Sequence, residues 1–210
     1  MDALILVDLQ PDFLPGGALA VSDGDAVLPV AADLAGRFDL VVATQDWHPA
    51  DHGSFAVNAD GEVGGLGELA GLPQVLWPVH CVQGSPGAQL HDSVDRGRLA
   101  AVFQKGTDPA VDSYSGFFDN GRRGDTGLSA WLRARGVTRT VICGLATDYC
   151  VKFTALDAVA EGFDVVVVSD ACRGVELTPG DVAAAWGELR AAGVRIVDSR
   201  RLKSRDRVPG

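Results

Sequence analysis

The stretch ALILVD, residues 3 to 8, is a run of five apolar side chains that stops at a carboxylate. Five similar runs follow along the chain: LVVAT (40–44), LAAVF (99–103), RTVICG (139–144), DVVVVSD (164–170) and VRIVD (194–198). Runs that are apolar on both faces of a strand are typical of buried parallel strands. Helical patterns alternate with them, so we predict an α/β fold: a Rossmann-like, three-layer α/β/α sandwich with a central six-stranded parallel sheet.

Start signals locate three helices between these runs. Asp125 precedes GLSAWLRARG, Thr147 or Asp148 precedes YCVKFTALDAVAEG, and Thr178 precedes VAAAWGELRAAG. Short polar side chains accept hydrogen bonds from the unpaired N–H groups of a helix start, so we expect these residues to be caps. The glycine-rich stretch 58–74 has neither the apolar pattern of a strand nor that of a helix. We therefore expect one domain over residues 1–210, with a loop or small insertion at about 53–76.

Charge and composition restrict the classes of function. The formal net charge is −10 and the pI is near 4.7, which argues against a protein that binds nucleic-acid phosphates. No apolar run approaches the roughly 18 residues of a membrane span, and the chain opens with an acidic residue where a secretory signal is basic. We expect a cytoplasmic protein with free cysteine thiols and a solvated basic tail: Arg200, Arg201, Lys203, Arg205 and Arg207. No heptad or apolar stripe marks an interface, which leaves a homo-oligomer open.

Three polar residues follow the ends of predicted strands: Asp8, Lys105 and Cys150. Ligands of open parallel sheets bind beyond the carboxyl ends of the strands. Cys150 falls in a predicted first helical turn, where the helix dipole and the Lys105 ammonium favour a nucleophilic thiolate, and Asp8 can move the proton. Backbone N–H groups, those of Ala146 and Cys150, can face a developing oxyanion. Together these features indicate acyl transfer through a thioester. Taken singly, each residue has an ordinary alternative: Asp8 could cap a turn, Lys105 could be a surface ammonium, and Cys150 could be a small buried hydrophobic residue.

Histidine placement indicates a metal site. The chain has 4 histidines, and the stretches TQDWHPADH (44–52) and WPVHC (77–81) hold three of them. Imidazole and carboxylate are the usual ligands of zinc, iron and manganese. The predicted metal ligands are Asp46, His48, His52 and His80. The alternative is a polar loop with unrelated histidines.

Five motifs give the chain a close resemblance to the nicotinamidases, or pyrazinamidases, of the isochorismatase-like cysteine hydrolases. They are VDLQPDFLPGGALAV, TQDWHPADHGSF, WPVHCVQGSPGA, FQKGTDPAVDSYSGF and GLATDYCVKFTALDA, and the likeness runs to about residue 198. The resemblance implies the isochorismatase-like hydrolase fold and a catalytic triad of Asp8, Lys105 and Cys150. It also implies that Asp46, His48, His52 and His80 bind one divalent metal ion, zinc first, with iron and manganese as alternatives.

The same resemblance implies details of the pocket. Phe13 and Trp77 would flank the aromatic ring of the substrate, with Leu19, Tyr114 and Leu145 also in the substrate-binding set. A cis peptide bond between Leu145 and Ala146 would shape the oxyanion hole. Ordinary core packing is the alternative explanation for Phe13 and Trp77.

The expected activity is hydrolysis of nicotinamide, and of pyrazinamide, to the acid and ammonia, as a step of NAD salvage. Three alternatives stay open from the sequence. One is an amidase in which a metal-bound hydroxide attacks and Cys150 is structural. The second is a metal-binding protein without catalysis, and the third is an amidase for a non-aromatic carbamoyl compound.

Overall fold

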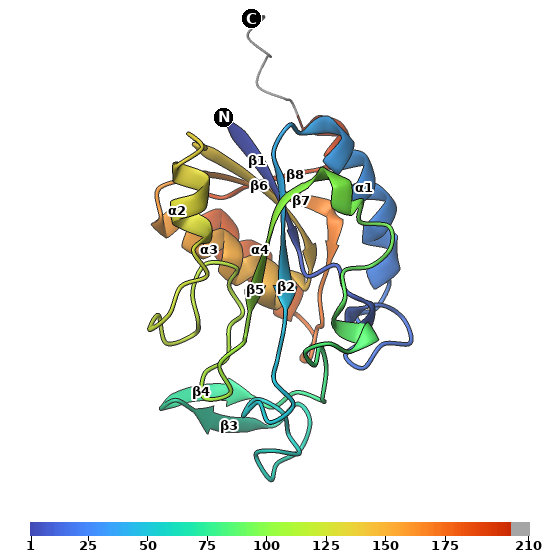
Figure 1. Cartoon of the computed structure of the whole chain (residues 1–210), viewed down its shortest axis with the longest axis vertical. Coiled ribbons are helices and arrows are strands. Elements are labelled where there is room, and N and C mark those ends of the chain that lie inside the picture. Colours follow the sequence, from blue (N-terminus) through green and yellow to red (C-terminus); the bar gives the residue numbers. More distant parts are fainter. Residues whose placement is uncertain (203–210) are drawn as a thin grey trace, which may run out of the picture.

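A parallel sheet of six strands forms the centre of the computed structural model, which describes residues 1–202 (Figure 1). The strand order is β5-β2-β1-β6-β7-β8, and every adjacent pair is parallel. The strands are β1 (Asp2–Val7), β2 (Val41–Asp46), β5 (Leu99–Lys105), β6 (Arg139–Leu145), β7 (Asp164–Arg173) and β8 (Arg195–Val197). Each overlaps one of the six apolar runs, so the predicted fold class is confirmed.

Helices cover both faces of the sheet. Helix α1 (Val27–Arg37) lies on one face, and α2 (Leu128–Arg133), α3 (Lys152–Ala160) and α4 (Asp181–Ala191) lie on the other (Figure 1). Right-handed crossovers require this arrangement, because the chain moves from β1 towards one edge through α1 and from β6 towards the other edge through α3. The sequence analysis assigned no helix to residues 27–37. The reason is local: α1 begins without a side-chain cap, after a 3₁₀ turn.

Two of the predicted caps do not cap their helices. The Asp148 carboxylate accepts the backbone N–H groups of Val175 and Glu176, at 2.9 and 2.8 Å. A π-helical turn, Thr147–Val151, leads into α3 without a side-chain cap. Helix α4 begins at Asp181 after Gly180, and the N–H of Thr178 donates to the Asp181 carboxylate.

The third predicted cap lies two residues from the observed one. Gly127 is the N-cap of α2, and the Asp125 carboxylate accepts the N–H of that glycine at 2.7 Å. The Asp125 side chain therefore orders the turn before the helix, although it does not cap the helix itself.

A separate antiparallel hairpin lies within the stretch predicted as a loop or small insertion. Strands β3 (Leu66–Leu69) and β4 (Leu72–Val75) pair only with each other, beyond the carboxyl ends of β2 and β5 (Figure 1). The segments that carry the predicted metal ligands enter and leave this hairpin, so the hairpin end of the molecule is the end at which the site forms.

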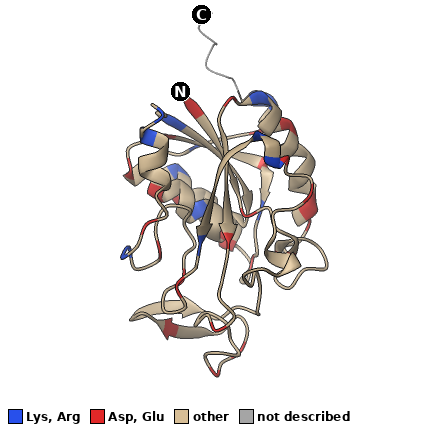
Figure 2. Cartoon of the chain, viewed as in Figure 1, with Lys and Arg blue, Asp and Glu red and all other residues tan. Residues whose placement is uncertain are grey.

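The basic tail is only partly described. Arg200 and Arg201 belong to a 3₁₀ turn, Ser199–Arg201, whereas Lys203, Arg205 and Arg207 lie outside the described residues. Elsewhere Lys and Arg are spread over several helices and loops and do not form one band (Figure 2). Within residues 1–202, none of the helices has the length and apolar character needed to cross a bilayer.

The two halves of the sheet meet where β1 and β6 pair. The chain leaves β1 for one edge and β6 for the other, so this position is the topological switch point, where ligands of such sheets bind. Gly144 of β6 has φ +131°, and a Cβ placed there would lie 2.0 Å from the carbonyl oxygen of Val7. Only glycine allows the two strands this close approach.

We expect Gly144→Ala to lower the free energy of unfolding by about 3 kcal/mol, because the methyl group overlaps backbone and the φ angle is unfavourable. Gly36→Ala is the matched control. Gly36 lies in α1, where a Cβ meets no atom within 4 Å, and the substitution should raise stability by about 0.5–1 kcal/mol. Urea unfolding of both variants measures the difference. Equal stabilities would show that the close approach of β1 and β6 is not a constraint.

Candidate active site

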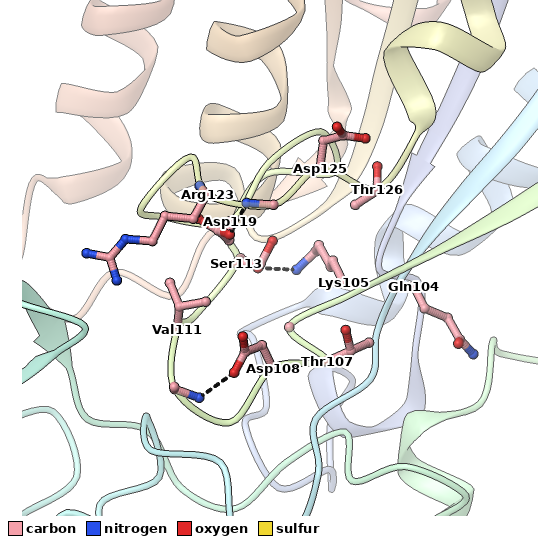
Figure 3. Close-up of a pocket in the computed structure, with 13 residues that line it drawn as sticks. Gln104, Lys105, Thr107, Asp108, Val111, Ser113, Asp119, Arg123, Asp125 and Thr126 are labelled. Carbon is pink, nitrogen blue, oxygen red and sulfur yellow. Dashed lines mark hydrogen bonds between the residues drawn. The ribbon is translucent and has the colours of Figure 1, made fainter.

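The buried ammonium of Lys105 joins the polar residues at the carboxyl ends of the strands. Its Nζ lies 3.0 Å from Asp8 Oδ2 and 2.6 Å from Asp46 Oδ1. It also lies 3.4 Å from Cys150 Sγ, and it donates to the Ser113 carbonyl at 2.9 Å (Figure 3). Asp8 follows β1, Asp46 ends β2, Lys105 ends β5 and Cys150 lies in the turn after β6. The structure therefore brings the three predicted catalytic residues together.

Burial and pairing set the charges of this group. Burial alone would lower the pKa of Lys105, but Asp46 and Asp8 raise it well above its ordinary value. Burial would likewise raise the pKa of Asp46, but Lys105 and His48 hold it well below its usual range. For Asp8 the effect of burial exceeds that of Lys105, and its pKa is raised. The site thus contains a fixed ammonium, a fixed carboxylate at Asp46 and a more basic carboxylate at Asp8.

The thiolate expected at Cys150 is a wrong prediction. Burial raises the pKa of the Cys150 thiol well above its usual value, Lys105 lowers it in part, and the negative charges of Asp8 and Asp46 raise it further. The sequence argument counted the helix start and the lysine but not the burial of Cys150. The resting residue is therefore a thiol, and it needs a base in order to become a nucleophile.

Three buried imidazoles lie beside this group, and each has its Nδ1 atom held by a neighbour. The partners are the Gly106 carbonyl for His48 at 2.8 Å, the Pro78 carbonyl for His80 at 2.8 Å and the Ser54 hydroxyl for His52 at 2.7 Å. A carbonyl oxygen can only accept, so the Nδ1–H groups of His48 and His80 donate and leave the lone pair on Nε2, an arrangement typical of histidine ligands of metals. At His52, Nδ1 also accepts the backbone N–H of Ser54 at 3.2 Å.

The Nε2 atoms fit a divalent metal ion. Those of His48 and His80 lie 3.2 and 3.5 Å from Asp46 Oδ2, and that of His52 is buried without any hydrogen-bond partner. Burial and the charge of His48 lower the pKa of His52 to about 4, so this imidazole is neutral at pH 7. An unpartnered, neutral imidazole in a buried site is suited to a metal and poorly suited to water.

The four predicted ligands are brought together in two overlapping groups. Asp46, His48 and His80 offer ligand atoms within 4.8 Å of one another. His52 forms a second such group with His48 and with Asp112, a buried carboxylate that the sequence analysis did not select. Asp112 lies within the FQKGTDPAVDSYSGF motif, but it follows no strand end, and its proximity to the histidines arises from the fold of the loop after β5.

An aromatic pocket opens above Cys150 and the histidines. Its lining includes four residues of the predicted substrate-binding set: Phe13, Leu19, Trp77 and Tyr114. The Phe13 ring packs edge-on against His80, and Trp77 Nε1 donates to the Tyr114 hydroxyl at 3.3 Å. These contacts give the pocket flat apolar walls that suit an aromatic ring.

The pocket lining differs in part from the predicted substrate-binding set. Leu145 ends β6, and its side chain is fully buried and does not line the pocket, so its role in substrate binding stays a prediction. The Leu145–Ala146 peptide bond is cis, as the resemblance implied. Tyr149 and Val175, which are outside the predicted set, line the pocket with Ala146. Tyr149 adjoins Cys150 in the sequence, and Val175 follows β7, so the strand-end rule could have found Val175.

A second hollow has a mostly polar lining. It is lined by residues of β5 and the following loop, including Thr107, Asp108, Asp119 and Arg123 (Figure 3). Neither Cys150 nor any histidine lines this hollow. The aromatic pocket, which contacts both, is therefore the candidate active site.

Comparison with known proteins agrees with this geometry. The isochorismatase domain model matches residues 2–201. Nicotinamidase of Escherichia coli is 54% identical over 198 residues, which cover 92% of this chain and 93% of that protein. The Acinetobacter baumanii nicotinamidase structure superimposes with a TM-score of 0.93 at 42% identity, covering 96% of this chain and 98% of the other.

A third relative was solved with a metal. The pyrazinamidase of Pyrococcus horikoshii in complex with zinc has a TM-score of 0.76 and 40% identity, with 94% of this chain and 98% of that chain covered. The matches extend over nearly the full length of each relative. The chain belongs to the isochorismatase family, and within that family to the nicotinamidases.

Proposed function

We propose that this chain hydrolyses nicotinamide to nicotinate and ammonia through a thioester on Cys150. The contact of one buried ammonium with Asp8, Asp46 and the Cys150 sulfur supports the proposal most strongly. The cation Lys105 contacts both the base and the nucleophile, and the three groups lie beside a pocket with aromatic walls. The names of the relatives support the same activity, and they also support pyrazinamide as a second substrate.

The residues divide the reaction as follows. Asp8 takes the proton of the Cys150 thiol, and the sulfur attacks the carboxamide carbon. The backbone N–H groups of Ala146 and Cys150 hold the oxyanion, and Asp8 returns the proton to the departing ammonia. Asp8 then deprotonates a water molecule, which cleaves the thioester and releases nicotinate. Lys105 stabilises the negative charge while it moves between sulfur and carboxylate.

A divalent metal would be held by Asp46, His48, His52 and His80, and when bound it supplies a Lewis acid that fixes the ring nitrogen of the substrate. We propose zinc, in agreement with the zinc complex of a relative; the same donors also bind iron and manganese. Asp112 offers a carboxylate oxygen close to the ligand atoms of His48 and His52, and we propose that it supports the metal site.

The pocket favours a small neutral amide. Among the described residues that line it there is no Lys or Arg, so it offers no ammonium or guanidinium group to a phosphate. The rings of Trp77, Tyr114 and Tyr149 contact one another edge-on and form a wall for a planar ring. This composition supports nicotinamide over a nucleotide that contains it. We propose that the reaction is a step of NAD salvage in the cytoplasm.

The first test is ammonia release by the purified, metal-loaded protein. We expect turnover of nicotinamide and pyrazinamide, no turnover of aliphatic amides of similar size, and loss of activity after chelation that added metal restores. Release from an aliphatic amide alone would contradict the proposed substrate and leave the cysteine chemistry intact. No release from any amide would contradict the proposed function.

Alkylation separates the cysteine route from attack by a metal-bound hydroxide. Iodoacetamide should abolish ammonia release in proportion to carbamidomethylation of Cys150, with the metal content unchanged. Peptide mass spectrometry identifies the modified thiol among Cys81, Cys143, Cys150 and Cys172, all of which are free and buried. Full activity after complete modification of Cys150 would support the metal-hydroxide alternative.

Removal of the ammonium tests its structural role. Lys105→Met leaves two buried carboxylates without their cation, and we expect the free energy of unfolding to fall by about 3–5 kcal/mol, with activity lost. Lys152→Met is the control, because Lys152 makes a surface ion pair with Glu188 that is worth under about 1 kcal/mol. Urea unfolding compares the variants, and equal stabilities would refute the role assigned to Lys105.

A further inference from the structure

Thr44 contacts Asp8, the base of the proposed mechanism. This residue lies in β2, beside the end of β1, and is fully buried. Its hydroxyl donates to Asp8 Oδ1 at 2.6 Å. Thr44 does not line the aromatic pocket, so it reaches the chemistry only through Asp8.

The direction of the Thr44 hydroxyl is fixed by packing. A Cβ placed on Gly116 would lie 2.5 Å from Thr44 Cγ2, so the threonine methyl fills the space that a side chain at residue 116 would need. The threonine χ1 angle is stiff because its Cβ is branched. With the methyl held against Gly116, the hydroxyl can only face Asp8.

This contact makes the two oxygens of Asp8 different. A carboxylate turns readily about its last torsion, and its two oxygens are otherwise equivalent. Thr44 occupies Oδ1, whereas Oδ2 lies 3.0 Å from Lys105 Nζ, the ammonium that also contacts the Cys150 sulfur at 3.4 Å. Oδ2 is therefore the oxygen that shares a neighbour with the nucleophile, and Oδ1 is the oxygen that already accepts a hydroxyl hydrogen.

We propose that Thr44 is a positioning residue that selects Oδ2 of Asp8 as the atom that carries the proton. In the first step the S–H bond of Cys150 breaks, an O–H bond forms at Oδ2, and the electron pair stays on sulfur. The same Oδ2–H bond later breaks as ammonia takes the proton. This inference rests on the proposed amide hydrolysis and adds a residue that the triad does not include.

The test compares variants that differ by one hydroxyl group. Thr44→Val keeps the shape and removes the donor, and we expect kcat for nicotinamide to fall roughly 10- to 100-fold with KM within about twofold. Thr44→Ser keeps the hydroxyl and should retain most of kcat. Alkylation of Cys150 by iodoacetamide gives a readout without substrate, and its rate should fall in Thr44→Val and not in Thr44→Ser.

Thr140 provides the matched control. It lies in β6, is fully buried, and its hydroxyl has no hydrogen-bond partner. Thr140→Val makes the same chemical change in the same sheet and should leave kcat and the alkylation rate within about twofold. If Thr44→Val fails to fold, Thr44→Ala and Thr44→Ser replace it as a pair that differs only in the hydroxyl.

The outcomes separate this inference from the function on which it rests. A wild-type protein that releases no ammonia overturns the proposed function and the inference with it. An active wild type with unchanged kcat in Thr44→Val overturns the inference alone. A loss of kcat that Thr44→Ser shows as well would also overturn the inference. Bound metal is measured in every variant, because Asp46 lies two residues from Thr44, and a loss of kcat that follows a loss of metal would overturn the inference too.

Discussion

The ammonium of Lys105 is the charge around which the site is built. A lysine that is 2% exposed costs several kcal/mol to bury unless it is paired, and here two carboxylates and a backbone carbonyl surround it. Its partners come from three separate parts of the chain. The strand order brings them together, since β1, β2 and β5 are neighbours and end at the same edge of the sheet. The order of the parallel strands therefore provides the partners that the buried cation needs.

Asp46 connects the two halves of the site. Its Oδ1 contacts Lys105, on the side of the nucleophile, and its Oδ2 faces His48 and His80, on the side of the metal. The Gln10 side chain fixes the backbone of this residue, because its amide accepts the N–H of Asp46 and donates to the C=O of Asp46, both at 2.8 Å. A loop that follows β1 thus aligns the residue that ends β2, and this residue joins the proposed nucleophile to the proposed metal ligands.

Local sequence patterns predict the strands of this arrangement and the residues that follow them. All six strands follow from runs that are apolar on both faces, and Asp8, Lys105 and Cys150 follow from their positions after strands. What depends on packing was predicted less well. Asp148 resembles a cap in sequence but binds the loop at Val175, and the thiol of Cys150 is controlled by burial that no local pattern reveals. Asp112 reaches the histidines only through a loop.

The shared contact with Lys105 explains how a base and a nucleophile whose pKa values are both raised can work together. Burial raises the pKa of Asp8 and that of Cys150, so both groups become harder to deprotonate in the same environment. Lys105 contacts both, and a proton that moves from sulfur to carboxylate moves the negative charge from one neighbour of the ammonium to another. The net charge around Lys105 does not change during that transfer. The site therefore does not need a thiolate at rest, because the cost of forming one is offset inside the ion-pair network at the moment of reaction.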